Sequence, residues 1–272
     1  MQVLLKATEW LTDATDVGRD LHMPPLKAFM DDTTVLVNSL RTATGILSRL
    51  DTLIGWSRMK FKPAKSRSLS ISKGKVADSV KFQISGQWIP TVSEEPVKSL
   101  GRWYDCSMKD TKQGTGFVQS AEDGLDKIAK TQLQGKFKVW ILQFMLIPKL
   151  LWPLLVYEIG ASIVEKVEKT INRHTRKWLG LPPGLTTVAL YSKQSKLKLP
   201  FKSLVEQYKC GKVGLQMMLN HSTDACIKNS QTELKSGRKW QAAKATREAE
   251  ESAKFKEVLG AVQVGRQGLG FG

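Results

Sequence analysis

The stretch that most constrains the fold of this chain is an apolar run over residues 139–157, VWILQFMLIPKLLWPLLVY. A run of this length must be covered, either by a lipid bilayer or by other parts of the protein. Lys149 lies near its centre, which would cost ~3 kcal/mol in a bilayer, and Pro148 and Pro153 interrupt it. The pattern therefore favours a kinked helix or a helical hairpin in a protein core over a membrane span. Trp140 and Trp152 in this region, and Trp178 beyond it, are expected in that core.

The charge of the chain indicates a polyanionic partner. Lys and Arg total 42 against 25 acids, a formal net charge of +17 over 272 residues. An excess of this size attracts nucleic acid or an anionic membrane surface, and it carries no information on fold. Hydrophobic residues make up 41%, which is typical of a folded protein.

Cysteine and histidine usage argues against a zinc site and against a disulfide framework. The three cysteines are widely spaced, and neither they nor the three histidines follow a metal-ligand spacing. The first residues, MQVLLKATEW, lack the basic and apolar segments of a secretory signal. We therefore expect an intracellular protein, in the nucleus or the cytoplasm, that is not secreted.

Hydrophobic periodicity divides the chain near residue 110. Before that point, helices are predicted over residues 2–11 and 41–57, and strands over 26–30, 33–37, 67–72, 81–84, 87–90 and 97–105. The dipeptide Ser85-Gly86 predicts a hairpin turn, and residues 109–116 are predicted to be a loop. Later segments are predicted to be helical, with breaks at Gly135, 179–184 and 198–200. The fold class expected is α+β followed by an all-α part.

Two adjacent acids, Asp31 and Asp32, separate the first two predicted strands. Adjacent carboxylates at a hairpin tip repel each other unless a cation lies between them, and hard oxygen donors suit Mg²⁺ or Mn²⁺. Asp also favours ordinary solvated turns. On the dipeptide alone, a plain turn is favoured over a metal site.

The order of the segments that follow points to one family. Phe29-Met30-Asp31-Asp32 is followed by a predicted helix, then by KPAKSRSL with Lys65, then by SLGRWY with Leu100, Gly101 and Tyr104. This series resembles the C-terminal part of a reverse transcriptase of the non-LTR retrotransposon (LINE) type. The resemblance covers most of the chain, and it is specific as an ordered series rather than motif by motif.

The resemblance implies a partial polymerase palm, of antiparallel strands with helices, followed by an all-α thumb and extension. Residues 1–108 would be the C-terminal half of the palm, 109–230 a helical thumb and connection, and 231–272 a charged helical extension with a flexible tail. Asp31 and Asp32 would be catalytic and would hold Mg²⁺ or Mn²⁺ once the site is completed. Lys65 would lie near the triphosphate, and Leu100, Gly101 and Tyr104 would form the primer grip.

This sequence departs from the family pattern in several places. The family usually has Tyr where Phe29 stands, and Asn where Lys62 stands, three residues before Lys65. The upstream strand-borne Asp of the family and its Gln-Gly motif do not occur before Asp31. Two-metal phosphoryl transfer requires carboxylates that bridge both ions. We therefore expect this chain to lack the fingers and the first half of the palm, and to be inactive alone.

Clusters of basic residues are the expected contacts with nucleic acid. From Trp56 to Lys75 the chain has seven cations and no acid. The expected binding residues, which also include two on a later helical stripe, are Arg58, Lys60, Lys62, Arg67, Lys73, Lys75, Arg173 and Arg176. Each neutralised phosphate would add salt-dependent affinity. The later stripe, with Lys166, Lys169 and Lys177, fits a duplex minor groove and a solvated helix equally well.

The function expected is that of a truncated RNA-directed DNA polymerase, with an RNA template, a DNA primer and the missing half of the palm and fingers as partners, and no membrane. The alternative is a non-catalytic, basic nucleic-acid-binding remnant. A third reading is a helical interaction protein, or a membrane-associated protein that uses residues 139–157. A nucleotide cyclase palm is disfavoured because no glycine-rich turn precedes Asp31.

Overall fold

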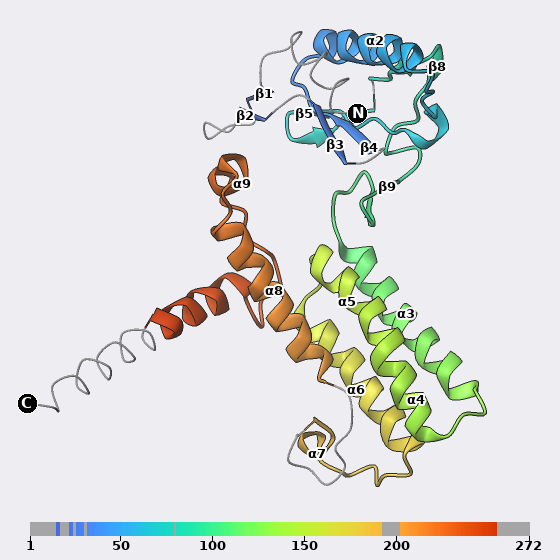
Figure 1. The fold of residues 1–272 in the computed structure, drawn as a ribbon, viewed down its shortest axis with the longest axis vertical. Coiled ribbons are helices and arrows are strands. Elements are labelled where there is room, and N and C mark those ends of the chain that lie inside the picture. The colour runs from blue at the N-terminus through green and yellow to red at the C-terminus, as the bar shows by residue number, and fades with distance from the viewer. Residues whose placement is uncertain are drawn as a thin grey trace, which may run out of the picture. The chain divides into compact units, whose positions relative to one another are not determined.

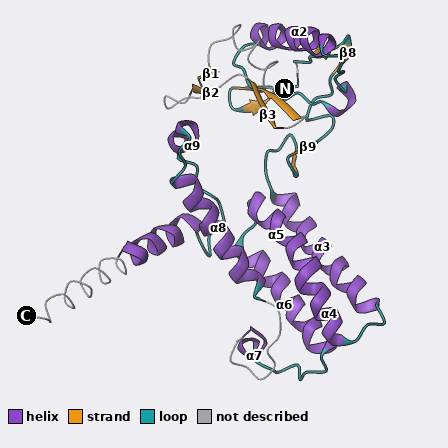
Figure 2. Ribbon diagram, viewed as in Figure 1, coloured by secondary structure: helices purple, strands orange, loops and turns teal. Residues whose placement is uncertain are grey.

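The computed structural model describes residues 15–16, 22–23, 26–29, 32–78, 80–191 and 202–254. These residues form an α+β protein whose strands pair two by two and antiparallel (Figures 1 and 2). The chain divides into two units. The first contains residues up to Lys109 together with Thr223–Ser230, and the second contains Asp110–Ser222 and the residues from Gln231 onward. The helix predicted over residues 2–11 lies outside the described residues.

The first unit carries all the described strands. Its hairpins pair β1 (Thr15–Asp16) with β2 (His22–Met23), β3 (Leu26–Phe29) with β4 (Asp32–Val35), β5 (Ile71–Ser72) with β6 (Lys75–Val76), β7 (Gln83–Ile84) with β8 (Gln87–Trp88), and β9 (Val97–Ser99) with β10 (Arg102–Tyr104). A short 3₁₀ helix, η1, spans Pro63–Lys65, and the short helix α9 spans Ala225–Ser230. The hairpin predicted at Ser85-Gly86 is confirmed. The hairpin of β5 and β6 around Lys73-Gly74 was not expected.

Helix α2 (Leu40–Trp56) provides the core of the first unit. Ser39 caps its N-terminus, because the side-chain oxygen accepts a hydrogen bond from the amide of Thr42 at 3.1 Å. Ile46 and Leu50 on its buried face pack against Leu26 of β3, and Val35, Val37 and Phe61 cover this cluster. The helix predicted over residues 41–57 is confirmed, and one small apolar cluster holds β3 and β4 in place.

The second unit is a bundle of helices. These are α3 (Thr111–Lys130), α4 (Gly135–Ile141), η2 (Leu142–Leu146), α5 (Ile147–Val156), α6 (Ala161–Trp178), α7 (Thr187–Tyr191), α8 (Leu204–Asn220) and a helix over residues 242–254. Within the segment predicted to be a loop, residues 109–116, residues 111–116 instead form the first turns of α3. Gly114 lies there against Ile163 of α6, so packing outweighs the low helix propensity of glycine.

The apolar run of the sequence forms one continuous helix, α4–η2–α5, over Gly135–Val156. Its middle turn, η2, is a π-helix that ends two residues before Pro148. Proline lacks the N–H that would bond to the carbonyl four residues earlier, and its ring crowds that carbonyl, so the regular ladder is interrupted here. Leu142, Leu146, Ile147, Leu150 and Leu154 are buried in the bundle core.

The tryptophan assignment was wrong for two of three residues. Trp140 and Trp152 lie on the outer face of α4–η2–α5, each more than half exposed, and only Trp178 packs against the core. In the described part of the chain, Gly135–Val156 is the one helix that is long and apolar enough to cross a membrane, and a third of its most apolar window is buried in the bundle.

The segment after residue 230 joins the second unit. The phenol of Tyr208 on α8 packs against Trp240, with ring centroids 5.8 Å apart. Ala242 and Thr246 of the following helix are fully buried. The charged extension therefore contains a helix over residues 242–254, and Ala242 and Thr246 lie on a face of it that is buried in the second unit.

Candidate nucleic-acid and metal site

The β3–β4 hairpin places Asp32 on an exposed face. Asp32 is the first residue of β4 and pairs with Phe29, the last residue of β3. Alternation along the strands turns Leu26 towards α2 and leaves Lys27, Phe29 and Asp32 exposed on the other face. Asp31 lies outside the described residues. The structure therefore describes one of the two carboxylates, that of Asp32, at the start of β4. The strand was predicted to begin one residue later, at Thr33.

The described residues do not complete a metal site. No group of three or more His, Cys, Asp or Glu side chains that could hold an ion lies within the described part of the chain. Asp32 is exposed and belongs to no such group. The carboxylates in the described part of the chain therefore do not provide the two-ion set that nucleotidyl transfer needs.

Lys65 ends the short helix η1, near the core of the first unit. Phe61, four residues earlier, packs against the Leu26–Ile46–Leu50 cluster, which fixes this loop beside α2. The amide of Lys65 donates to the carbonyl of Lys62 at 2.9 Å. The side chains of Lys60, Lys62 and Lys65 are all exposed. The loop thus presents three cations on a rigid turn.

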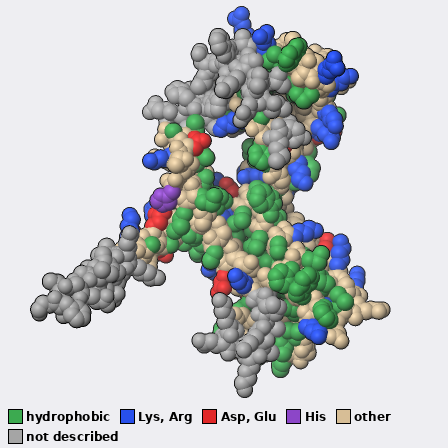
Figure 3. All heavy atoms as spheres, viewed as in Figure 1, with side chains coloured by type: hydrophobic (Ala, Val, Ile, Leu, Met, Phe, Trp, Pro, Cys, Tyr) green, Lys and Arg blue, Asp and Glu red, His purple; other side chains and the backbone are tan. Residues whose placement is uncertain are grey.

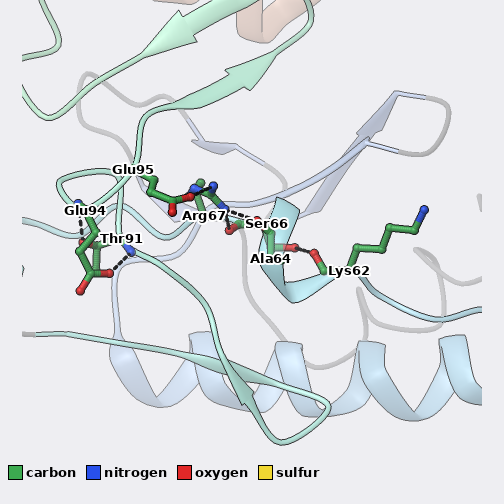
Figure 4. Close-up of polar contacts among 7 residues, drawn as sticks. All are labelled: Lys62, Ala64, Ser66, Arg67, Thr91, Glu94 and Glu95. Carbon is green, nitrogen blue, oxygen red and sulfur yellow. Dashed lines mark hydrogen bonds and ion pairs between the residues drawn. The ribbon is translucent and has the colours of Figure 1, made fainter.

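Arg67 is part of the internal structure of the first unit (Figure 4). Its guanidinium donates to the carbonyl oxygens of Ala64 and Ser66 at 2.6 and 2.8 Å and to the carboxylate of Glu95. The side chain is 12% exposed. Arg67 therefore ties the η1 loop to the turn at residues 91–95, in contrast to the Lys62 ammonium, which points away from these contacts in Figure 4.

Glu94, on the same turn, has a polar environment of its own. Its carboxylate accepts hydrogen bonds from Lys81 and from the amide of Thr91 at 2.9 Å. The hydrogen bond from Lys81, followed by that from Thr91, lowers the pKa of Glu94. A shallow hollow of about 320 Å³ lies between Lys81, Trp88 and Glu94.

Arg58 and Lys73 lie at turns, and Lys75 is the first residue of β6. Arg58 follows the C-terminus of α2 with a φ of 59°, and Lys73 occupies the β5–β6 turn with a φ of 50°. All three side chains are exposed. These residues are accessible to a large ligand such as a nucleic acid.

The β9–β10 hairpin contains the predicted primer-grip residues. Leu100 and Gly101 form its two-residue turn, with φ of 48° and 82°, which matches the turn type that Gly at the second position favours. Tyr104 is half-buried, and the Arg102 guanidinium lies 5.2 Å from its ring centroid. Among the described strands, β9 and β10 pair only with each other, so no ladder joins them to β3 and β4.

The exposed tryptophans of this unit are further candidate binding residues. Trp56 is 81% exposed, Trp88 is 62% exposed, and Trp103 lies across the ladder from Lys98, whose ammonium is 5.9 Å from the indole ring. The alternation of VKSLGRWY carried a signal for Trp103, because it places Trp103 and Lys98 on the same face of a hairpin. Nothing comparable in the sequence distinguishes Trp56 from a core residue.

In the second unit the two predicted arginines differ. Arg173 is exposed on α6. The Arg176 guanidinium donates to the carbonyl of Leu185 at 3.1 Å from Nε and 2.8 Å from Nη2, which holds the loop that follows α6. Only Arg173 therefore presents its charge to solvent.

Comparison with known proteins does not show a family for this chain. Neither a family model nor a curated protein sequence matches the chain.

Proposed function

We propose that this chain is a truncated RNA-directed DNA polymerase of a non-LTR retrotransposon, with the C-terminal half of a palm and a helical thumb. The observation that carries the proposal is the tight β3–β4 hairpin, which exposes Asp32 across from Phe29. The cationic η1 turn with Lys65 and the Leu100-Gly101 hairpin follow it in the order of such a polymerase.

Each motif has a role in the full-length form of the enzyme. Asp31 and Asp32 supply carboxylate oxygens for Mg²⁺ or Mn²⁺, and Lys65 lies near the triphosphate and helps pyrophosphate leave. Leu100, Gly101 and Tyr104 hold the primer end. The partners are an RNA template, a DNA primer and the missing half of the palm and fingers.

The chain alone is inactive under this proposal. Before Asp31 the sequence contains no Asp at the end of an apolar, strand-like segment. The third carboxylate, which would bridge both ions, is therefore missing. Without it, the two ions that stabilise the attacking and leaving oxygens are not held together.

A primer-extension assay on the purified chain tests this inactivity. With an RNA template, a DNA primer and Mg²⁺ or Mn²⁺, we expect no product, while a complete reverse transcriptase extends the same primer. Full-length product that disappears in the Asp31→Ala/Asp32→Ala variant would overturn the inactivity of the chain alone. The polymerase origin is tested separately, by reading the DNA upstream of Met1: an in-frame strand-borne Asp followed by Gln-Gly supports it, and an unrelated reading frame contradicts it.

A second candidate function is non-catalytic nucleic-acid binding, which the exposed tryptophans of the first unit favour. Trp56 and Trp88 present ring faces that bases can stack on, and Lys60, Lys62 and Lys73 supply cations for phosphates. Under this function, binding of RNA or DNA is salt-dependent and survives Asp31→Ala with Asp32→Ala.

Filter binding of a labelled single-stranded RNA tests this second function. We expect Lys60→Glu with Lys62→Glu to weaken binding at least about tenfold, because each lost cation removes a phosphate contact. Lys244→Glu with Lys254→Glu, on the last described helix, is the matched control with the same charge change. Loss of binding in the double Asp variant would instead point to a metal-dependent site.

A further inference from the structure

Several large apolar side chains are exposed on the outer face of α4–η2–α5 in the second unit. They project from one side of the helix and are each at least half exposed; we call them the apolar stripe: Phe137, Trp140, Phe144, Met145 and Trp152. Figure 3 shows hydrophobic side chains gathered on the surface of this unit with Lys and Arg side chains beside them. A soluble bundle normally keeps such a set inside its core, so a surface of this kind marks an interaction site.

The charged residues next to the stripe in the sequence have one sign. Between Asp126 and Glu158 the chain contains five lysines and no acid. Four of these lysines are exposed and none of the ion pairs among the described residues involves them: Lys127, Lys130, Lys136 and Lys149. The Lys136 ammonium lies 5.0 Å from the ring of Phe137, so charge and apolar surface adjoin. The partner that complements this face is therefore apolar and anionic together.

A groove of about 340 Å³ extends the cationic edge of the stripe. Ser120, Asp123 and Lys127 of α3 line one side of it, and Lys149 of α5 lines the other. The Asp123 carboxylate accepts a hydrogen bond from Gln119 at 2.9 Å within α3. Lys149 is also one helical turn after Met145 on the face of the stripe. The ammonium groups of Lys127 and Lys149 therefore line the groove together with the Asp123 carboxylate.

We propose that the apolar stripe lies flat on an anionic lipid surface. The opposite face of the same helix is fixed in the bundle core by Leu142, Leu150 and Leu154, so the helix stays in the plane of the membrane interface and does not cross it. Lys149 and the prolines argue against a bilayer span, but they are compatible with this orientation. The lysines contact anionic head groups, and the aromatic rings occupy the boundary between head groups and acyl chains.

The packing of the stripe favours lipid over a nucleic-acid strand. Trp140 and Phe144 pack against each other with centroids 5.1 Å apart and planes at 40°, which leaves less ring face for a stacked base. Met145 has no ring for a base to stack on. Insertion into an apolar layer needs exposed apolar area, which all five residues provide.

Vesicle co-sedimentation of the full chain tests the proposal. The probes are vesicles of phosphatidylcholine alone and vesicles with about one third phosphatidylserine. We expect binding to the anionic vesicles that weakens with salt and little binding to the neutral ones. The variant Phe137→Ser/Trp140→Ser/Phe144→Ser should weaken this binding by at least about tenfold, and Lys136→Glu with Lys149→Glu should do the same.

Matched controls separate the stripe from general charge and exposed apolar area. Trp56→Ser and Met218→Ser remove exposed apolar side chains elsewhere, and Lys166→Glu with Lys169→Glu repeats the charge change on α6. All three should bind the anionic vesicles as the wild type does, and circular dichroism should show that every variant is folded. The proposal is overturned if the wild type does not bind anionic vesicles, or if the variant Phe137→Ser/Trp140→Ser/Phe144→Ser binds them as strongly as the wild type. It is also overturned if this variant loses binding of single-stranded RNA but keeps binding of anionic vesicles, because the stripe would then be a nucleic-acid site.

Discussion

Gly135, the first residue of α4, lies directly against the backbone carbonyl of Trp178, the last residue of α6. A β-carbon at position 135 would lie 1.9 Å from the carbonyl oxygen of Trp178, and because that oxygen is backbone it cannot rotate away. We therefore expect Gly135→Ala to lower the free energy of unfolding of the second unit by about 3 kcal/mol. Urea unfolding followed by circular dichroism measures this change.

Gly116 on α3 offers the matched control, because a β-carbon there meets no atom within 4 Å. Gly116→Ala should be neutral or should stabilise the helix by up to about 1 kcal/mol, since alanine favours helices over glycine. Equal destabilisation by the two substitutions would show that the close approach at Trp178 is not what constrains position 135.

The buried lysine Lys212 of α8 closes the C-terminal end of α5. Its ammonium donates to the carbonyls of Leu155 and Tyr157 at 2.9 and 3.0 Å, and the side chain is 2% exposed. These carbonyls belong to the helix end, where a cation is favourable and unpaired acceptors are costly. We expect Lys212→Met to lower the free energy of unfolding by about 2 kcal/mol, measured by urea unfolding.

Lys209, one turn earlier on α8, is the control for this substitution. Its ammonium lies 5.8 Å from the ring of Trp240 and closes no helix end. Lys209→Met should change the free energy of unfolding by no more than about 0.5 kcal/mol. If Lys212→Met were as mild, the two hydrogen bonds to the end of α5 would contribute nothing to stability.

Asp51 of α2 holds the β7–β8 turn. Its carboxylate accepts hydrogen bonds from the hydroxyl of Ser85 and from the amide of Ser85 at 3.1 Å. Asp51→Ala removes both, so we expect faster hydrogen exchange at the Ser85 amide and a loss of about 1 kcal/mol in the first unit. Asp51→Asn keeps one oxygen acceptor and should retain most of the protection; equal exchange in wild type and Asp51→Ala would contradict this role.

Local signals in the sequence predicted much of the first unit. The spacing of Ala43, Ile46, Leu50 and Ile54 gives one buried face on α2, and Ser85-Gly86 is a dipeptide that suits a tight hairpin. Lys73-Gly74 carries a similar signal. The hairpin there was missed because the alternation of residues 67–72 suggested one longer strand with Leu69 and Ile71 buried, whereas both are exposed.

Long-range contacts decided the features that the sequence did not predict. In the sequence, nothing distinguishes Arg67 from an exposed cation. In the structure its guanidinium is paired with the carboxylate of Glu95, 28 residues later. Gly114 predicts a loop on propensity, but its lack of a side chain allows α3 to approach Ile163. An apolar run predicts that a helix is buried. Only the packing of the other helices in the bundle determines that Trp140 lies on the face of this helix that is exposed to solvent. For the site, the sequence predicted a hairpin at the two acids but began its second strand at Thr33, so the position of Asp32 within that strand was not expected. The absence of a bridging carboxylate stays a prediction.

His174 of α6 should make stability depend on pH in mildly acidic solution. Its ring is half-buried, at 5.6 Å and edge-on to Trp178, and burial, followed by the charge of Arg173, lowers the pKa of His174 below its ordinary 6.5. Between that lowered pKa and 6.5 the unfolded chain binds the proton and the folded chain does not, so stability falls as pH decreases through this window and is complete above it. His174→Gln should flatten this part of the curve while leaving stability at pH 8 nearly unchanged. Urea unfolding at a series of pH values measures the curves of the wild type and of this variant, and an acid slope that is the same in both would contradict the role of His174.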